Sequence, residues 1–238
     1  MNKLLVPVLC VVAAIGFLVS IYLVFYNAPL DYTIDPETQR LVGTSLFFNQ
    51  KIYFFHVPNA IMLFVAVTVA GCASILYLWK RTPVWDDLAA ATVDISVAFG
   101  AVVLATGSIW AKAAWDVWWQ WEPRLTMSLL LWLILVGYVL VRKFAGPSAD
   151  RVAAGMAIFG MVGVPFIYTM VGQDSHPAAG TKGVVATQGH AMLAAFWTSF
   201  ATFLIWFIVL VITRVQSTRA ERELRELRER ALDLGVLE

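Results

Sequence analysis

Charged residues are scarce in this sequence. Asp, Glu, Lys and Arg make up 14% of its 238 residues, whereas 60% are hydrophobic and the mean hydropathy is +0.75. Ordinary globular proteins are about half apolar and about a quarter charged. A soluble core of this size cannot absorb so much apolar surface, so the composition predicts an integral membrane protein.

Signals for several other functions are also missing. The net charge of +1 lacks the basic excess that nucleic-acid binding requires. The two cysteines, Cys10 and Cys72, lie far apart without CxxC or Cys/His spacing, so we expect no disulfide, zinc site or redox chemistry. The sequence contains no P-loop pattern, so any ATP-driven step depends on other chains.

Six apolar stretches approach or exceed the length of about 20 residues that a helix needs to cross a bilayer. The first is longer than the apolar region of a signal peptide, about 7 to 15 residues, and no A-x-A cleavage site follows it, so we expect a retained helix. The predicted fold is all-α, with six transmembrane helices in residues 1–214 and a charged helical tail in residues 215–238. The predicted spans are 4–26, 54–79, 88–109, 125–141, 152–171 and 191–212.

Basic residues are distributed unevenly around these spans. Twelve of the seventeen Lys and Arg fall on the side that carries both termini, and five fall on the other side. Since short cytoplasmic loops collect Lys and Arg, both termini are predicted to be cytoplasmic. The connections 27–53, 110–124 and 172–190 then lie outside, and all three histidines, His56, His176 and His190, lie at or near the outer surface.

Tryptophan gathers in one of these outer connections. Interfacial belts usually place one or two aromatic residues at each helix end, so the cluster exceeds the need of a belt. On a helix ended by Pro123, one face could lie in the interface while another offers an aromatic floor to a flat ligand. A belt and a ligand platform both remain open on composition alone. The cluster consists of Trp110, Trp115, Trp118, Trp119 and Trp121.

The order of residues in this connection is specific. Residues 106–126 read TGSIWAKAAWDVWWQWEPRLT. This segment closely resembles the tryptophan-rich WWD signature of the haem-handling proteins of cytochrome c maturation. The number of spans, the chain length and the signature between the third and fourth spans resemble the CcmC family, the smallest members of that superfamily. The resemblance covers residues 54–212 well, and the first helix fits only by its position.

Three positions depart from the family pattern. The family usually has Gly at the position of Ala111, often Gly at the position of Asp116, and Asp at the position of Glu122. Glu122 keeps the negative charge but carries it on a longer arm. The matching positions that the resemblance carries over as haem contacts are Trp110, Trp115, Trp118, Trp119, Trp121 and Arg124, with Glu122 in the position of the family's Asp.

The resemblance also implies two external histidines that ligate haem iron. The first stands in an H-V-P setting, which here is His56, and the second lies between spans five and six, which here is His176 followed by Pro. His190 is left over. Chemistry supports this assignment, because haem iron accepts two trans imidazole nitrogens. Pro58 is expected at a helix start, which would leave His56 beside exposed backbone amides and favour its neutral form.

Haem propionates need basic partners. Arg124 could bind one propionate through two parallel N–H donors, and Lys112 could offer a point charge. Arg124 could instead pair with Glu122 or serve as an interfacial anchor, and these roles stay open.

The resemblance implies a haem-binding and transfer protein rather than a classical enzyme. Haem b is expected to be held at the periplasmic face of the bacterial inner membrane and passed to the haem chaperone CcmE. The ABC-transporter components CcmA and CcmB, the small membrane protein CcmD and the lipid bilayer are the other expected partners. A membrane cytochrome b with two histidine ligands is an alternative, although its ligands normally lie at membrane depth. A small-molecule permease is another, although broken helices and midplane polar residues are not prominent.

Two polar features remain outside this assignment. Asp94 is an intramembrane ionisable group near the cytoplasmic end of the third span, and a tuning or structural role is favoured over proton transport. The tail around Leu224 and Leu227 is dense in opposite charges. It is predicted to be a solvated helix, with a short coiled-coil contact as the alternative.

Overall fold

The computed structural model describes residues 4–29, 32–43, 50–146, 149–169 and 189–236. Within these ranges, six helices are long and apolar enough to cross a membrane. The prediction of an all-α, multi-pass membrane protein is therefore confirmed. The helices are α1 (Leu5–Tyr22, continued by the π-helical turn η1, Leu23–Asn27), α2 (Gln50–Lys80), α3 (Pro83–Trp115), α4 (Pro123–Phe144), α5 (Ala149–Thr169) and α6 (His190–Asp233).

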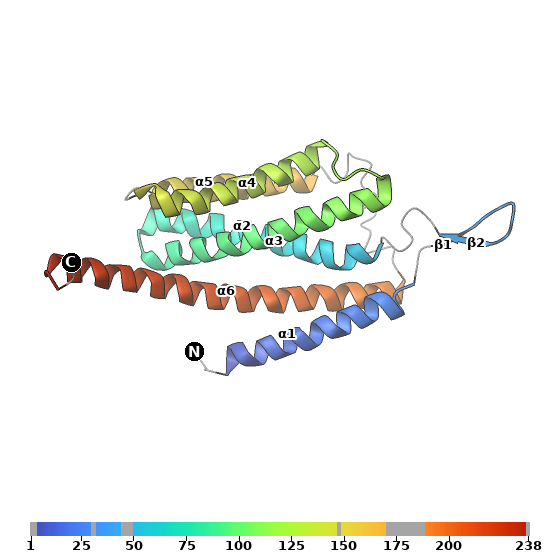
Figure 1. The fold of residues 1–238 in the computed structure, drawn as a ribbon, viewed down its shortest axis with the longest axis horizontal. Coiled ribbons are helices and arrows are strands. Elements are labelled where there is room, and N and C mark those ends of the chain that lie inside the picture. The colour runs from blue at the N-terminus through green and yellow to red at the C-terminus, as the bar shows by residue number, and fades with distance from the viewer. Residues whose placement is uncertain (1–3, 30–31, 44–49, 147–148, 170–188, 237–238) are drawn as a thin grey trace.

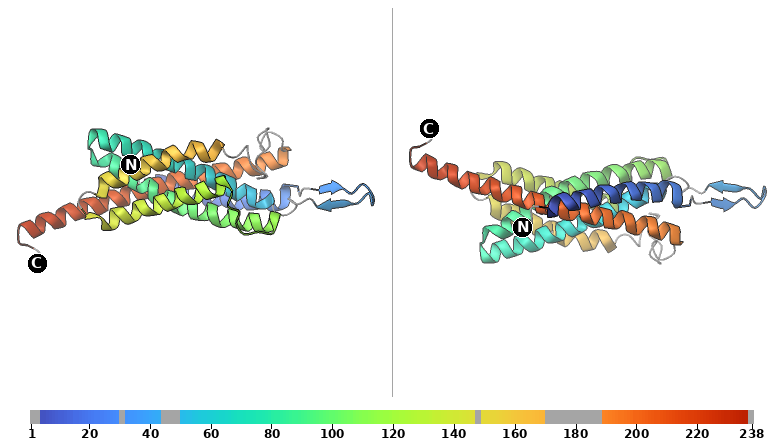
Figure 2. Two further views of the ribbon diagram at one scale, coloured as in Figure 1. Left: turned by 90° about the horizontal axis from the view of Figure 1, so that it is seen from above. Right: turned by 90° about the horizontal axis from the view of Figure 1, so that it is seen from below.

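The helices form a bundle with α1 at its edge (Figure 1). Helix α2 packs against α3, α5 and α6, and α4 packs against α3 and α5. The main apolar core lies between these helices, where Val67 of α2 and Leu135 of α4 are fully buried. Helix α1 packs chiefly against α6 and crosses it on the outside of the bundle (Figure 2). Its other side exposes large apolar side chains such as Leu18, which suits a lipid-facing helix.

A short hairpin between α1 and α2 was not predicted. Strand β1 (Tyr32–Ile34) pairs in antiparallel fashion with β2 (Leu41–Gly43). Asp35 closes the turn, because its carboxylate accepts hydrogen bonds from the backbone N–H groups of Glu37 and Thr38 at 2.8 and 3.2 Å. These bonds favour the charged form and lower the pKa of Asp35 below its ordinary value.

The two ends of the bundle differ in character. The hairpin, the connection between α3 and α4 and the beginning of α6 lie at one end, and the C-terminal part of α6 projects from the other (Figure 1). The tryptophan-rich connection and the charged tail are therefore separated by the length of the bundle.

Helix α6 extends far beyond the predicted boundary at residue 212. The whole helix runs for 44 residues, from His190 to Asp233, which corresponds to about 66 Å at 1.5 Å per residue. The tail is not wholly solvated, because the Arg222 guanidinium donates hydrogen bonds to the Asp87 carboxylate of α3, the shortest at 3.0 Å. Leu224 and Leu227 are 68% and 61% exposed.

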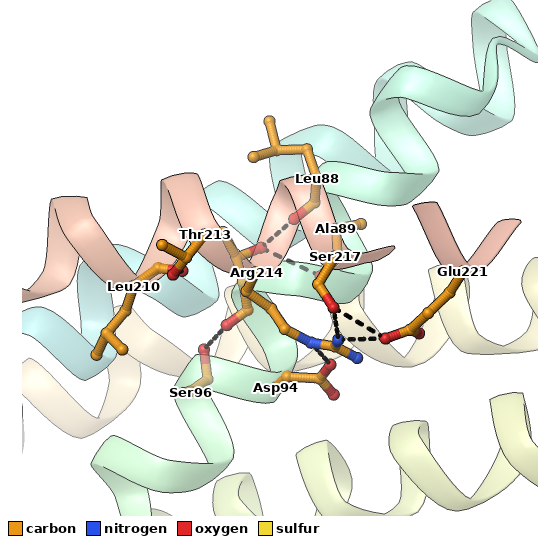
Figure 3. Close-up of polar contacts among 10 residues, drawn as sticks. Leu88, Ala89, Asp94, Ser96, Leu210, Thr213, Arg214, Ser217 and Glu221 are labelled. Atoms are coloured by element: carbon orange, nitrogen blue, oxygen red, sulfur yellow. Dashed lines mark hydrogen bonds and ion pairs between the residues drawn. The ribbon is translucent and has the colours of Figure 1, made fainter. Parts of the chain in front are cut away.

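Asp94 lies in a second contact between α3 and α6. Arg214 of α6 donates from Nε to the Asp94 carboxylate at 2.7 Å and from Nη1 to Glu221 at 2.8 Å (Figure 3). A third aspartate of α3, Asp86, receives two hydrogen bonds from Arg142 of α4 at 2.7 and 2.9 Å. Each aspartate thus neutralises an arginine from a neighbouring helix, which supports the structural role favoured for Asp94.

The contact between Arg222 and Asp87 predicts a specific loss of stability. Arg222→Ala should lower the free energy of unfolding by about 1–3 kcal/mol, because the Asp87 side chain, only 5% exposed, loses its charged partner. The measurement is equilibrium unfolding in detergent micelles. Arg219→Ala is the matched control, because its ion pair with Glu223 has side chains 66% and 53% exposed and should contribute at most about 0.5 kcal/mol. Equal losses in the two variants would contradict a specific role for the Asp87 contact.

Candidate functional site

His56 lies inside α2 rather than at its beginning. The prediction of a helix start at Pro58 is wrong, because α2 is already helical at Gln50 and Pro58 is an internal proline. The helix extends upstream because its polar first residues find partners at the end of the first span. Lys51 donates a hydrogen bond to the Ala28 carbonyl at 2.6 Å, and Gln50 donates one to the Pro29 carbonyl.

The imidazole of His56 is seated on α3. Its Nδ1 lies 2.8 Å from the Thr106 hydroxyl oxygen, and its ring meets that of Trp110 edge to face, with centroids 5.8 Å apart and planes at 77°. Gly107 favours this close approach, because a Cβ at that position would lie 3.3 Å from Cε1 of His56, a tight contact that the ring would have to relieve by a small shift. Thr106, Gly107 and Trp110 therefore fix the place and the orientation of the ring.

The tryptophan segment is not a helix ended by Pro123. Helix α3 ends at Trp115, where Asp116 adopts the left-handed conformation at φ 60° and its N–H donates to the Lys112 carbonyl at 3.1 Å. Residues 116–122 are non-helical, and Pro123 begins α4. Proline favours this first helical position because its fixed φ is already helical.

Lys112 is engaged at this turn. Its ammonium donates to both the side-chain and the backbone oxygen of Asp116. The point charge that Lys112 was predicted to offer a propionate is thus paired with a neighbouring carboxylate.

The five tryptophans differ in exposure, and Trp115 and Trp119 are half-buried. Trp110 is 5% exposed and belongs to an apolar cluster with side chains of η1, α2 and α6. Trp118 and Trp121 are 61% and 77% exposed. Trp119 meets Trp121 edge to face, with centroids 6.0 Å apart. The segment thus offers an aromatic surface beside a buried indole.

One cavity brings most of the predicted site residues together. Residues of α2, α3 and α4 and Ile167 of α5 line it, and its volume of about 70 Å³ is well below the roughly 300–1,000 Å³ of small-molecule pockets. Trp119 lines it, and the buried Trp119 indole N–H has no hydrogen-bond acceptor among the described residues. Glu122 and Trp121 are not among its lining residues. The predicted site residues that line it are His56, Trp110, Trp115, Trp118, Trp119 and Arg124.

The structure describes only one of the other two histidines. His176 lies outside the described residues, so its prediction as second ligand stays a prediction. His190 is exposed and is the first residue of α6.

Two residues beside His56 were not predicted as site residues. Gly107 lines the cavity and Thr106 contacts the imidazole. Thr106 and Trp110 are four residues apart and so share a helix face. Trp132 of α4 also lines the cavity, and its indole N–H donates to the Val97 carbonyl at 3.0 Å. No spacing in the sequence indicated that contact.

The fold and the site define a class: a multi-pass helical membrane protein with a histidine and a tryptophan cluster around one cavity at one end of the bundle. The family model of CcmC, heme exporter protein C, matches residues 1–230. The chain therefore belongs to the heme exporter protein C family.

Individual relatives match parts of the chain. The heme exporter protein C of Bradyrhizobium diazoefficiens is 39% identical over 119 residues, which cover 49% of this chain and 45% of that protein. The Paracoccus denitrificans protein of the same name is 28% identical over 177 residues, 70% of this chain and 72% of that protein. The Escherichia coli K12 protein is 30% identical over 132 residues, 52% of this chain and 51% of that protein. The alignment thus spans about half the length of two of these relatives.

Proposed function

We propose that the protein binds haem b at the outer end of the bundle and delivers it to the haem chaperone CcmE during c-type cytochrome biogenesis. The observation that carries this proposal is the convergence of His56, four tryptophans of the signature and Arg124 on one cavity. An imidazole suits haem iron, flat indoles suit the macrocycle and a guanidinium suits a propionate.

The residues present fit such a cargo. The cavity holds only about 70 Å³, which has room for a few water molecules, so the macrocycle belongs on the aromatic surface at its mouth. Trp118 is well exposed there. The buried Trp119 N–H, which has no acceptor among the residues described, and Arg124 are donors suited to a carboxylate. Trp121 and Glu122, which do not line the cavity, are assigned to the edge of this aromatic surface.

His176 is proposed as the second axial ligand. The resemblance supplies this role, because His176 is followed by Pro in the connection between α5 and α6. Helix α6 begins at the end of the bundle that carries the tryptophan segment (Figure 1), which supports a meeting of this connection with the site.

The proposed setting is the bacterial inner membrane, with both termini cytoplasmic and the haem site periplasmic. The twelve-to-five distribution of basic residues supports this orientation. Residues 1–214 would form the haem-handling membrane domain, and residues 215–238 a cytoplasmic tail. CcmA, CcmB and CcmD are the proposed assembly partners beside CcmE, and ATP hydrolysis would belong to them.

Cysteine labelling tests the orientation. In a variant without Cys10 and Cys72, a cysteine at position 116 should react with a membrane-impermeant maleimide applied to spheroplasts, because the Asp116 side chain is 92% exposed. A cysteine at position 224, where Leu is 68% exposed, is the matched control and should react only after the membrane is opened. The reverse pattern would overturn the orientation and the periplasmic site together.

Histidine substitutions test the proposed ligands. His56→Ala and His176→Ala should each reduce bound haem and abolish loading of CcmE, because loss of one axial ligand leaves the iron five-coordinate. His190→Ala should change neither. The measurements are the absorption spectrum of the purified protein and covalent haem on CcmE at matched membrane levels. Equal losses in all three variants would mean that no specific pair exists.

Tryptophan substitutions separate a platform from an interfacial belt. Trp118→Ala should lower haem loading of CcmE about three- to tenfold at unchanged protein level, because an aromatic contact contributes about 0.5–1.5 kcal/mol. Trp79→Ala is the matched control, since Trp79 is 78% exposed at the other end of α2 and should affect loading little. If both variants accumulate and load the chaperone normally, the cluster is only a belt.

A further inference from the structure

The hydroxyl of Thr106 makes two kinds of hydrogen bond. It lies 2.7 Å from the Val102 carbonyl oxygen of its own helix and 3.3 Å from that of Val103. The same oxygen lies 2.8 Å from Nδ1 of His56. A carbonyl oxygen can only accept, so the single hydroxyl proton is directed at Val102. The hydroxyl is then an acceptor toward His56.

This directionality fixes the protonation of the ring nitrogens. An acceptor at 2.8 Å requires a proton on Nδ1 of His56, and a neutral imidazole with a proton on Nδ1 has its lone pair on Nε2. We infer that Thr106 is a positioning residue that holds His56 as the Nδ1–H tautomer. The lone pair on Nε2 is thereby left available to bind the haem iron. The part of this inference that concerns iron rests on the proposed function, whereas the tautomer itself does not.

The opposite tautomer is disfavoured by the helix. Nδ1 without a proton would require the Thr106 hydroxyl to turn toward the ring and to give up the Val102 carbonyl. Threonine in a helix has restricted side-chain rotamers and commonly donates to the carbonyl four residues earlier. Trp110 and Gly107 meanwhile hold the ring against α3, so Nδ1 cannot easily seek another partner. Histidines that bind metals generally donate their other N–H to such a partner, and its loss typically costs ten- to a hundredfold in affinity.

The first experiment reads the tautomer without haem. In protein labelled with 15N-histidine and reconstituted in nanodiscs, the His56 signals are those missing from His56→Asn. They should report a protonated Nδ1 and an unprotonated Nε2. Thr106→Val, which keeps the shape and removes the hydroxyl, should abolish this preference, and Thr106→Ser should retain it. A wild-type protein with its proton on Nε2, or a Thr106→Val variant with an unchanged spectrum, would overturn the inference.

The second experiment measures haem affinity by titration of the absorption spectrum. Thr106→Val should bind haem about tenfold more weakly, and Thr106→Ser close to normally. Thr68→Val is the matched control, because Thr68 of α2 makes the same bond to the carbonyl four residues earlier, at 2.8 Å, on an exposed part of the helix. It should bind haem normally.

The two proposals fail separately. If His56→Ala keeps full haem affinity, the proposed ligand is wrong while the tautomer measurement still stands. If His56→Ala loses haem but Thr106→Val binds as wild type does, His56 is a ligand and Thr106 does not position it.

Discussion

A polar side chain inside a bilayer must find its partner within the protein, and this constraint organises the molecule around α3. At one end of α3, three aspartates each meet an arginine from α4 or α6. Toward the other end, Thr106 meets His56 and Trp110 packs beside it. Helix α3 is therefore the element that both the stability of the bundle and the proposed haem site depend on.

The ion pairs with α3 fix the position of the C-terminal half of α6. Arg214 and Arg222 lie about two turns apart on α6, and their partners, Asp94 and Asp87, lie two turns apart on α3 in the opposite order. The two helices thus run antiparallel with one fixed register. Because α6 begins at the end that carries the tryptophan segment, the same register holds its second turn beside α3, where Phe196 belongs to the cluster of Trp110.

Much of this architecture could be read from the sequence, since long apolar runs signal spans directly. The order and number of the helices and the convergence of His56 with the tryptophans were predictable, the latter only through the WWD signature. The helix boundaries were not, because polar residues continue the helices outside the apolar runs. Gln50 and Lys51 extend α2 by hydrogen-bonding to carbonyls at the end of the first span, and Arg222 secures the extension of α6. Such long-range partners leave no periodicity in the sequence.

The distribution of burial across the site suits the proposed transfer of a cargo better than its permanent storage. Trp110 is buried and His56 is bound to Thr106 and packed against Trp110, whereas Trp118 and Trp121 are mostly exposed on a non-helical segment. A fully enclosed pocket would bind a macrocycle tightly but would release it slowly, because affinity differences are expressed chiefly in dissociation rates. A cavity of about 70 Å³ cannot enclose a ligand of that size. An oriented imidazole beneath an open aromatic surface would instead fix the iron at one point and leave the edge of the ring accessible to a partner.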